Sequence, residues 1–214
     1  MKHMLPGDIE KKSMEIISEE LDQLGILLPQ AHEAVVKRVI HTTADFDYGK
    51  AMFFSEDAVA YGVSALKSGA NIVTDTNMAK SGVNKPSLMK LGGQVFCYMA
   101  DEDVAVAAKE QGTTRASASM VKAAQECPGA IIAVGNAPTA LFELGRLIEE
   151  SLRPALVIAV PVGFVNVVES KEYIVSLCQN HQVPVIAAMG RKGGSGVAAA
   201  ICNALLYTAT DRKL

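Results

Sequence analysis

His41 is one of only four histidines in the 214-residue chain, and Thr42, Thr43, Asp45 and Asp47 follow it closely. An imidazole changes its charge near neutral pH, which makes it suited to general acid or base chemistry. A histidine near the end of a helix can also simply interact with the helix dipole, so both roles stay open. The two aspartates at this spacing would suit a metal ion, but no further cluster of ligands supports one, and we expect no metal site.

A glycine-rich segment, GRKGGSG at 190–196, places two cations beside small residues. Backbone N–H groups at the start of a helix bind carboxylate or phosphate, and Arg191 and Lys192 would add positive charge there. A tight turn that requires glycine explains the same sequence equally well. The segment matches neither the dinucleotide-binding fingerprint nor the P-loop, so nucleotide binding is only weakly indicated. The candidate anion contacts are Arg191, Gly193, Gly194 and Ser195.

Other polar residues stand where turns are expected. In GNAPTA (135–140), Asn136 and Thr139 either contact a ligand or cap the helix that follows. Lys171 comes soon after PVGF and is either a ligand contact or a solvated surface charge. Arg115 stands at an expected helix start, where a cation opposes the helix dipole, and this suggests an anion-binding role. The weaker candidates, in the TDTNM segment, are Asp75 and Asn77.

Five short apolar runs predict the elements that position these residues; they lie at 71–75, 94–99, 130–135, 155–160 and 184–189. The runs are continuous rather than alternating, which is the pattern of strands covered on both faces. Segments of helical length lie between or after them, at 101–111, 115–126, 138–151, 169–180 and 195–207. This alternation predicts an α/β fold, with a mostly parallel sheet of about five strands flanked by helices on both faces. Ligands of such sheets bind beyond the carboxyl ends of the strands, where most of the candidates fall.

The first third of the chain is predicted to be helical. Apolar residues recur at helical spacing up to Gly25, and a second helix is expected from Pro29 to about His41. A third is expected to run to Gly69, with Ser55 as its N-cap. Because the chain contains no linker, repeat or low-complexity tract, we predict one domain, residues 1–214, with an N-terminal helical segment.

The composition excludes several classes of protein. Half of the residues are hydrophobic and a fifth are charged, which is unlike a disordered chain. A net charge of −3 argues against a nucleic-acid binder, although residues 1–33 carry −4 and the remainder carries +1, so an acidic ligand stays compatible. The sequence lacks an apolar stretch of membrane-spanning length, and its start lacks the apolar segment of a signal peptide. The four cysteines include no C-x-x-C pair, so we expect free thiols and a cytoplasmic location.

Several segments, taken in order, resemble the precorrin-8X methylmutase family, including its cobalt-precorrin-8 members. They are IEKKSMEII, RVIHTTADFDY, TDTNM, TTRASA, IAVGNAPTALFEL, PVGFVNVVESK and GRKGGSGVAAAICNAL. Together they extend from Ile9 to about Leu206, and the combination is specific although each segment alone is weak. Ala116 departs from the serine more often expected after this arginine, which leaves the polar contacts of that turn open.

The resemblance implies a cofactor-free isomerase of cobalamin (vitamin B12) biosynthesis. Such an enzyme moves a methyl group on ring C of a corrin-type macrocycle by a 1,5-sigmatropic shift and yields hydrogenobyrinic or cobyrinic acid. It implies that His41 donates or accepts a proton and that Ser13 and Arg38 contact the substrate. It further implies a homodimer with a large corrinoid cleft near the subunit interface.

A corrinoid is an apolar macrocycle with acetate and propionate arms. Its site should therefore combine apolar walls for the macrocycle with scattered hydrogen-bond donors for the arms. We expect these donors to include the backbone amides of GNAPT and GGS and the side chain of Lys192. The remaining expected contacts are Thr42, Arg115, Asn136, Thr139, Lys171, Arg191, Gly193, Gly194 and Ser195. A corrinoid carrier without catalysis is the alternative that uses the same cleft, and an enzyme acting on a nucleotide or sugar phosphate is a third hypothesis.

Overall fold

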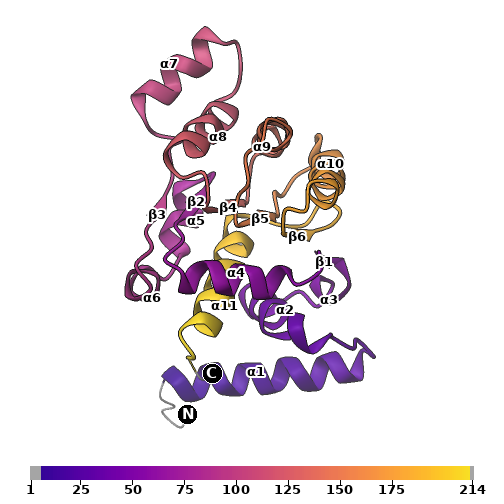
Figure 1. Ribbon diagram of the computed structural model, residues 1–214. Helices are drawn as coiled ribbons and strands as arrows, with labels where there is room; N and C mark the ends of the chain where they lie inside the picture. Colours follow the sequence, from indigo (N-terminus) through magenta and orange to yellow (C-terminus); the bar gives the residue numbers. More distant parts are fainter. Residues whose placement is uncertain (1–5, 213–214) are drawn as a thin grey trace.

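Strands and helices alternate over most of the chain, as the apolar runs predict (Figure 1). The computed structural model describes residues 6–212. The strands are β1 (Met52–Phe54), β2 (Ile72–Thr74), β3 (Val95–Phe96), β4 (Ile131–Val134), β5 (Leu156–Ala159) and β6 (Val185–Ala188). The helices are α1 (Pro6–Gln23), α2 (Gln30–Thr43), α3 (Tyr48–Ala51), α4 (Ala58–Lys67), α5 (Asn77–Gly82), α6 (Lys85–Lys90), α7 (Glu102–Glu110), α8 (Arg115–Glu126), α9 (Pro138–Glu149), α10 (Val167–Asn180) and α11 (Ser195–Ala209).

The six strands form one sheet in the order β1-β6-β5-β4-β2-β3. Neighbouring strands pair in parallel except for β1, which runs antiparallel to β6 and places Met52 opposite Ala188. The prediction of a mostly parallel α/β sheet is confirmed, with one strand more than the five expected. The additional strand is β1, whose three residues are too few to show a periodic pattern in the sequence.

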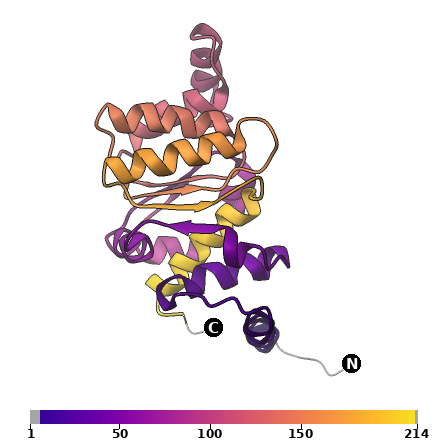
Figure 2. The same cartoon turned by 90° about the vertical axis from the view of Figure 1, so that its right-hand side faces the viewer.

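Helices cover both faces of the sheet, and each face carries its own hydrophobic core (Figure 2). On one side α4, α5 and α11 contact the strands, and α2 packs on α11. On the other side α9 and α10 contact the strands, and α8 packs on α9. Successive side chains of β4 alternate between the two cores, with Ile131 on the α11 side and Ile132 on the α9 side. Burial on both faces explains why the strands are continuous apolar runs.

Helix α11 crosses the first core and brings the glycine-rich segment to the edge of the sheet. It contacts α2, α4 and α5, and ten of its residues are buried. Small residues permit this close packing, since a Cβ atom on Gly82 of α5 would lie only 2.7 Å from Cβ of Ala199. Because α11 begins at Ser195, the segment 190–196 connects the carboxyl end of β6 to this central helix and supplies its first two residues.

The ends of several elements differ from the sequence prediction. Ser55 does not cap α4: Asp57 precedes that helix, and the Ser55 hydroxyl instead accepts a hydrogen bond of 2.9 Å from the Val185 amide. The short helices α3, α5 and α6 were not predicted, because four to six residues are too few to show a helical period. The helix expected at 115–126 is α8 with the same bounds, and the other expected helices are present with shifted ends; residues 1–5 of the first lie outside the described part.

The strand order reverses direction between β2 and β4. From β2 the chain first adds β3 on one side and then adds β4, β5 and β6 on the other. In open α/β sheets, ligands bind at such a reversal, beyond the carboxyl ends of the strands. Within residues 6–212, no helix combines the length and the hydrophobicity that crossing a membrane would demand.

Candidate active site

Four loops meet beyond the carboxyl ends of β2, β4, β5 and β6. A Cβ atom on Gly135, after β4, would lie 2.9 Å from Cα of Ser195, so this loop touches the start of α11. The hydroxyl oxygen of Thr76, after β2, lies 2.8 Å from that of Ser195. The Gly194 amide donates a hydrogen bond of 2.8 Å to the Val160 carbonyl after β5. The structure therefore places the candidate segments after these strands at one edge of the sheet.

The end of α2 adjoins the glycine-rich loop. Nζ of Lys192 lies 2.7 Å from Oδ2 of Asp45 and 2.5 Å from Oδ2 of Asp47, and a Cβ atom on Gly196 would lie 3.9 Å from the Thr42 methyl carbon. Lys192 is thus paired within the protein rather than free for a ligand, which corrects the expectation. The hydrogen bond from Lys192 also lowers the pKa of Asp45. Across residues 6–212, the potential metal-binding side chains form no group of three or more.

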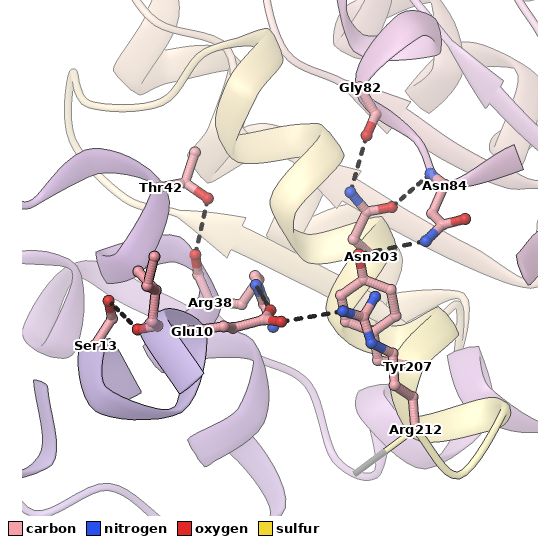
Figure 3. A network of polar contacts seen from close by, with 10 residues as sticks. Glu10, Ser13, Arg38, Thr42, Gly82, Asn84, Asn203, Tyr207 and Arg212 are labelled. Atoms are coloured by element: carbon pink, nitrogen blue, oxygen red, sulfur yellow. Dashed lines mark hydrogen bonds and ion pairs between the residues drawn. The ribbon is translucent and has the colours of Figure 1, made fainter. Parts of the chain in front are cut away.

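Helix α2 presents Arg38 and His41 within one helical turn, in contrasting surroundings. His41 is exposed, so its imidazole is open to a ligand. Arg38 is only 8% exposed; its guanidinium lies 5.0 Å from the centroid of the Tyr207 ring and pairs with Glu10 through Nη1 at 2.8 Å (Figure 3). Side chains three residues apart are neighbours on a helix surface. One ligand can therefore contact both residues.

One edge of the Arg38 guanidinium has no partner among the described residues. Its Nε and Nη2 atoms are buried and make no hydrogen bond. These two N–H groups form the side of a guanidinium that binds a carboxylate through two parallel hydrogen bonds. A buried donor without a partner costs about 1–3 kcal/mol. A carboxylate placed there would satisfy both donors, which makes this edge a candidate anion contact that becomes accessible when the side chains covering it move.

Glu10 is a residue of this site that residue types alone did not indicate. Its carboxylate pairs with Arg38 and, at 3.0 Å, with Arg212, whose guanidinium lies 4.3 Å from the centroid of the Tyr207 ring (Figure 3). Burial by itself raises the pKa of Glu10, but the hydrogen bond from Arg38 and the charges of Arg38, Arg212 and His41 lower it overall. The only sequence signal for Glu10 was its place in the IEKKSMEII segment.

The hydroxyl groups of Ser13 and Thr42 each donate a hydrogen bond to a backbone carbonyl of their own helix. Ser13, which is half-buried on α1, donates to the Ile9 carbonyl at 2.9 Å. Thr42 donates to the Arg38 carbonyl at 3.0 Å (Figure 3). A hydroxyl retains acceptor lone pairs after donating. In this structure both residues can therefore accept a hydrogen bond from a ligand, and neither offers it a free donor.

The backbone N–H groups of the turn after β4 are already occupied, which corrects a second expectation. The carboxylate of Asp75 accepts hydrogen bonds from the amides of Gly135 and Asn136 at 2.8 Å and of Ala137 at 2.9 Å. Asp75 is 1% exposed and lies directly after β2. The protein's own carboxylate thus fills the position where these amides would have bound a ligand.

Lys171 also has a different role from the one expected. Its side chain is fully buried, and Nζ donates to the carbonyl oxygens of Gly190 at 2.9 Å and Lys192 at 2.8 Å. Desolvation lowers the pKa of Lys171 to about 8. Because both acceptors belong to the glycine-rich loop, Lys171 holds that loop in place and does not face a ligand. Sequence could not separate this role from a solvated or ligand-binding lysine, because the acceptors are backbone atoms.

The close packing and the backbone conformation of the glycine-rich loop require glycine at positions 193 and 194. A Cβ atom on Gly193 would lie 2.1 Å from the Val160 carbonyl oxygen, a distance that excludes any other residue. Gly194 has a φ of 129°, in the region that favours glycine, and its amide is bonded to the same carbonyl. We expected the Gly194 N–H group to bind an anion, but this hydrogen bond leaves it unavailable. The requirement for a tight turn explains both glycines.

Arg115, Asn136 and Thr139 lie near one another at the starts of α8 and α9. The hydroxyl oxygen of Thr114, which precedes Arg115, is 2.9 Å from that of Thr139, and the Ser117 hydroxyl donates to the Thr139 carbonyl at 3.2 Å. Ala137 occupies the N-cap position of α9 without a side-chain bond, so neither candidate caps that helix. Arg115 and Asn136 are exposed and Thr139 is half-buried, which leaves these side chains available to a ligand.

Arg191 stands beside an exposed apolar loop that the sequence did not single out residue by residue. Its guanidinium lies 5.5 Å from the centroid of the Phe164 ring, in the loop that follows β5. Phe164 is 83% exposed and Val165 is 77% exposed. Such a surface, rimmed by a cation, suits a ligand with an apolar body and acidic arms.

A groove of about 850 Å³ lies at the opposite, amino-terminal edge of the sheet. Its lining includes Ser55, Tyr61, Gln179, Gln182 and Pro184. None of the candidate residues takes part in it. We assign the site to the carboxyl edge of the sheet because the charged side chains and hydrogen-bond donors of the candidate residues lie there, and the size of this groove does not outweigh them.

Comparisons with known proteins identify the family to which the chain is similar. The family model described as precorrin-8X methylmutase matches residues 8–208. A cobalt-precorrin-8 methylmutase from Priestia megaterium is 47% identical over 201 residues, covering 94% of this chain and 87% of the relative. A precorrin-8X methylmutase from Pseudomonas aeruginosa is 36% identical over 206 residues, covering 96% and 95%. A solved structure of precorrin-8x methyl mutase from Thermus thermophilus superposes with a TM-score of 0.84 at 38% identity, covering 96% of this chain and 99% of that one.

Proposed function

The chain belongs to the precorrin-8X methylmutase family, and from this premise we propose that it isomerises a corrin-type intermediate of cobalamin biosynthesis by moving a methyl group. The observation that carries the proposal is the buried Arg38, whose Nε and Nη2 atoms have no hydrogen-bond partner among residues 6–212 and which lies one helical turn from the exposed His41. A corrinoid brings acetate and propionate arms around an apolar macrocycle. One carboxylate arm on Arg38 would place the macrocycle beside His41.

His41 acts as the proton donor or acceptor in this mechanism. In the cobalt-free macrocycle its imidazole protonates, or hydrogen-bonds to, the ring C nitrogen, which makes the conjugated system poorer in electrons; where cobalt occupies that nitrogen, His41 acts on another acceptor of the conjugated system. The bond from the methyl carbon to the ring carbon beside that nitrogen then breaks as a bond to the adjacent ring carbon forms, in a 1,5-sigmatropic shift. No external methyl donor is consumed, and the reaction develops little net charge. Orientation and one assisted proton transfer supply most of the catalysis.

The remaining substrate arms are held along the edge of the sheet. Arg115 and Arg191 supply exposed cations, and Asn136, Thr139 and Ser195 supply polar side chains nearby. Ser13 and Thr42 add acceptors next to Arg38 and His41. The exposed apolar loop at Phe164 suits the face of the macrocycle.

Cobalt-precorrin-8 is the proposed natural substrate. Relatives from Priestia megaterium and Salmonella typhimurium, each 47% identical to this chain, are named cobalt-precorrin-8 methylmutases. Relatives named precorrin-8X methylmutase, from Pseudomonas aeruginosa and Sinorhizobium sp, are 36% and 35% identical. Cobalt occupies the ring nitrogens and so changes what His41 can protonate. Parallel turnover assays with both substrates decide the point, and faster conversion of the cobalt-free compound would contradict this assignment.

The absorption spectrum of the corrinoid provides the test of the reaction. We expect the purified protein to convert the substrate spectrum into that of the product. The His41→Ala variant should bind the product but convert substrate about 10² to 10⁴ times more slowly. Binding without conversion by the wild-type protein would instead indicate a non-catalytic corrinoid carrier. Conversion by His41→Ala at the wild-type rate would remove His41 from its proposed role.

We further propose that residues 1–214 form one domain and that two copies form a homodimer in the cytoplasm. Both cores pack on a single sheet, which supports one domain.

Helix α1 lies at the outer side of the molecule and exposes Ile9 and Ile16, which supports a second copy packing on it (Figure 1). All four cysteines are buried free thiols, which suits a reducing compartment. Light scattering should give twice the chain mass of 22.6 kDa; a monomer at assay concentration contradicts the dimer.

A further inference from the structure

The carboxylate of Asp75 is buried, and backbone amides of another loop occupy both of its oxygen atoms. It accepts three consecutive backbone hydrogen bonds, from Gly135, Asn136 and Ala137, across a sequence separation of 60 to 62 residues. Asp75 follows β2 and the three amides follow β4, the two neighbouring strands at which the sheet order reverses. These bonds therefore fasten two loops together at the ligand-binding edge.

Holding a carboxylate in this place is unfavourable for folding. Desolvation raises the pKa of Asp75, and the hydrogen bonds from Gly135, Ala137 and Asn136 offset only part of that effect. A raised pKa means that the folded protein binds a proton at Asp75 more readily than the unfolded chain does. The charged form consequently costs folding free energy at neutral pH. What the carboxylate provides in return is the fixed geometry of the turn.

The geometry of that turn reaches several candidate substrate contacts. Asn136 lies inside the bonded triplet, and its exposed side chain moves with the backbone that Asp75 holds. Gly135 rests on the backbone of Ser195, where an added Cβ atom would come within 2.9 Å. Two residues after the triplet, Thr139 bonds to Thr114 at the start of α8. A displaced turn would therefore disturb donors on three separate elements.

We propose that Asp75 is a positioning residue for substrate binding. It does not touch the substrate; it sets the places of Asn136, Thr139 and Ser195, which hold the arms of the macrocycle. The identity of that ligand rests on the proposed function. Because these contacts lie on the loops and not on α2 with His41, loss of Asp75 weakens binding while leaving the rate of the bound complex nearly unchanged.

The test variant is Asp75→Asn, which keeps the shape but replaces one acceptor oxygen with a donor that opposes an amide N–H group. With the corrinoid that the wild type converts, KM and the product Kd should rise about tenfold or more, and kcat should stay within about threefold. Amide hydrogen exchange at residues 135–137 should accelerate. The matched control is Asp101→Asn, which removes a carboxylate paired with Lys122 before α7 and should change none of these values.

Unchanged KM and Kd, or a fall in kcat at constant KM, would overturn the proposal. Amide hydrogen exchange at residues 135–137 of Asp75→Asn that stays at the wild-type rate would also overturn the proposal, and this measurement needs no substrate. If the wild-type protein converts no corrinoid, the proposed function fails instead. If Asp75→Asn does not fold, Asn136→Ala, which removes an exposed side chain, should show the same rise in KM at constant kcat. An unchanged KM in Asn136→Ala would then overturn the proposal.

Discussion

The Arg38 guanidinium and the Glu10 carboxylate form an ion pair of 2.8 Å that joins α2 to α1 beside His41. The pair engages Nη1 of Arg38, whereas Nε and Nη2 have no partner in the part of the chain that the structure describes. A second carboxylate would not have to displace Glu10 from Nη1, but because Nε and Nη2 are buried it reaches them only if the side chains that cover them move. This relationship makes the N-terminal helix part of the site, although α1 precedes every strand of the sheet in the chain.

Replacing Arg38 with lysine tests the unpaired edge. Arg38→Lys keeps the charge but cannot offer two parallel N–H groups, so we expect the product Kd to rise about 10- to 100-fold. Spectroscopic titration with the corrinoid product measures this. The control is Arg146→Lys, since Arg146 is an exposed arginine of α9 paired with Glu143 and Glu150. Equal affinities of the two variants would show that the edge of Arg38 binds no carboxylate.

Glu10 should make stability depend on acid pH. Its pKa is lowered in the folded protein, so its stabilisation is present above the ordinary value of 4.5 and is lost as pH falls through the folded pKa. Urea unfolding at pH 7 should show Glu10→Gln to be less stable than wild type by about 1 kcal/mol. That difference should shrink toward pH 3.

The control for this experiment is Glu15→Gln, which breaks only a solvent-exposed pair with Lys12 on the same helix. Exposed pairs contribute about 0–1 kcal/mol, so this variant should follow the wild-type curve closely. A Glu10→Gln difference that is constant from pH 7 to pH 3 would contradict the assigned pKa shift.

The Lys192 bridge should matter for activity more than for stability. Lys192 is 43% exposed in its side chain, so solvent screens its pairs with Asp45 and Asp47, and removing them should change the unfolding free energy little. It nevertheless joins the segment after His41 to the glycine-rich loop. We expect Lys192→Gln to lower kcat/KM about 5- to 50-fold and Lys192→Arg to restore most of it.

Lys122→Gln provides a matched control, because Lys122 also bridges two aspartates, Asp101 and Asp103, on the α7–α8 pair. It should leave kcat/KM unchanged. Equal effects of Lys192→Gln and Lys122→Gln on kcat/KM would show that the Lys192 bridge has no particular role in the site.

Lys171 should make stability depend on alkaline pH. Its pKa falls from 10.5 to about 8 on folding, so between these values the unfolded chain binds the proton and the folded protein does not. The unfolding free energy of wild type, relative to Lys171→Met, should therefore rise by up to about 3 kcal/mol as pH increases from 8 to 10.5. Chemical denaturation across this range measures the change. A difference that is flat with pH would show that the buried amine is not desolvated as the structure indicates.

The sequence alone determined the layers of the fold. The continuous apolar runs predicted every strand except β1, and the segments between them predicted the main helices, because burial on both faces leaves a local pattern. The family signature and the candidate positions at strand ends were also visible in the sequence, since glycine-rich and polar turns are local features.

Only the tertiary structure decided what each polar group does. Asp75 accepts hydrogen bonds from the backbone amides of the turn after β4, and Lys171 donates to backbone carbonyls of the glycine-rich loop. Glu10 forms an ion pair with Arg38. Each of these partners lies between 19 and 62 residues away in the chain. A donor or acceptor looks the same in sequence whether a ligand or the protein satisfies it. Its partner is set by which distant segments fold together, and a local pattern carries no record of that.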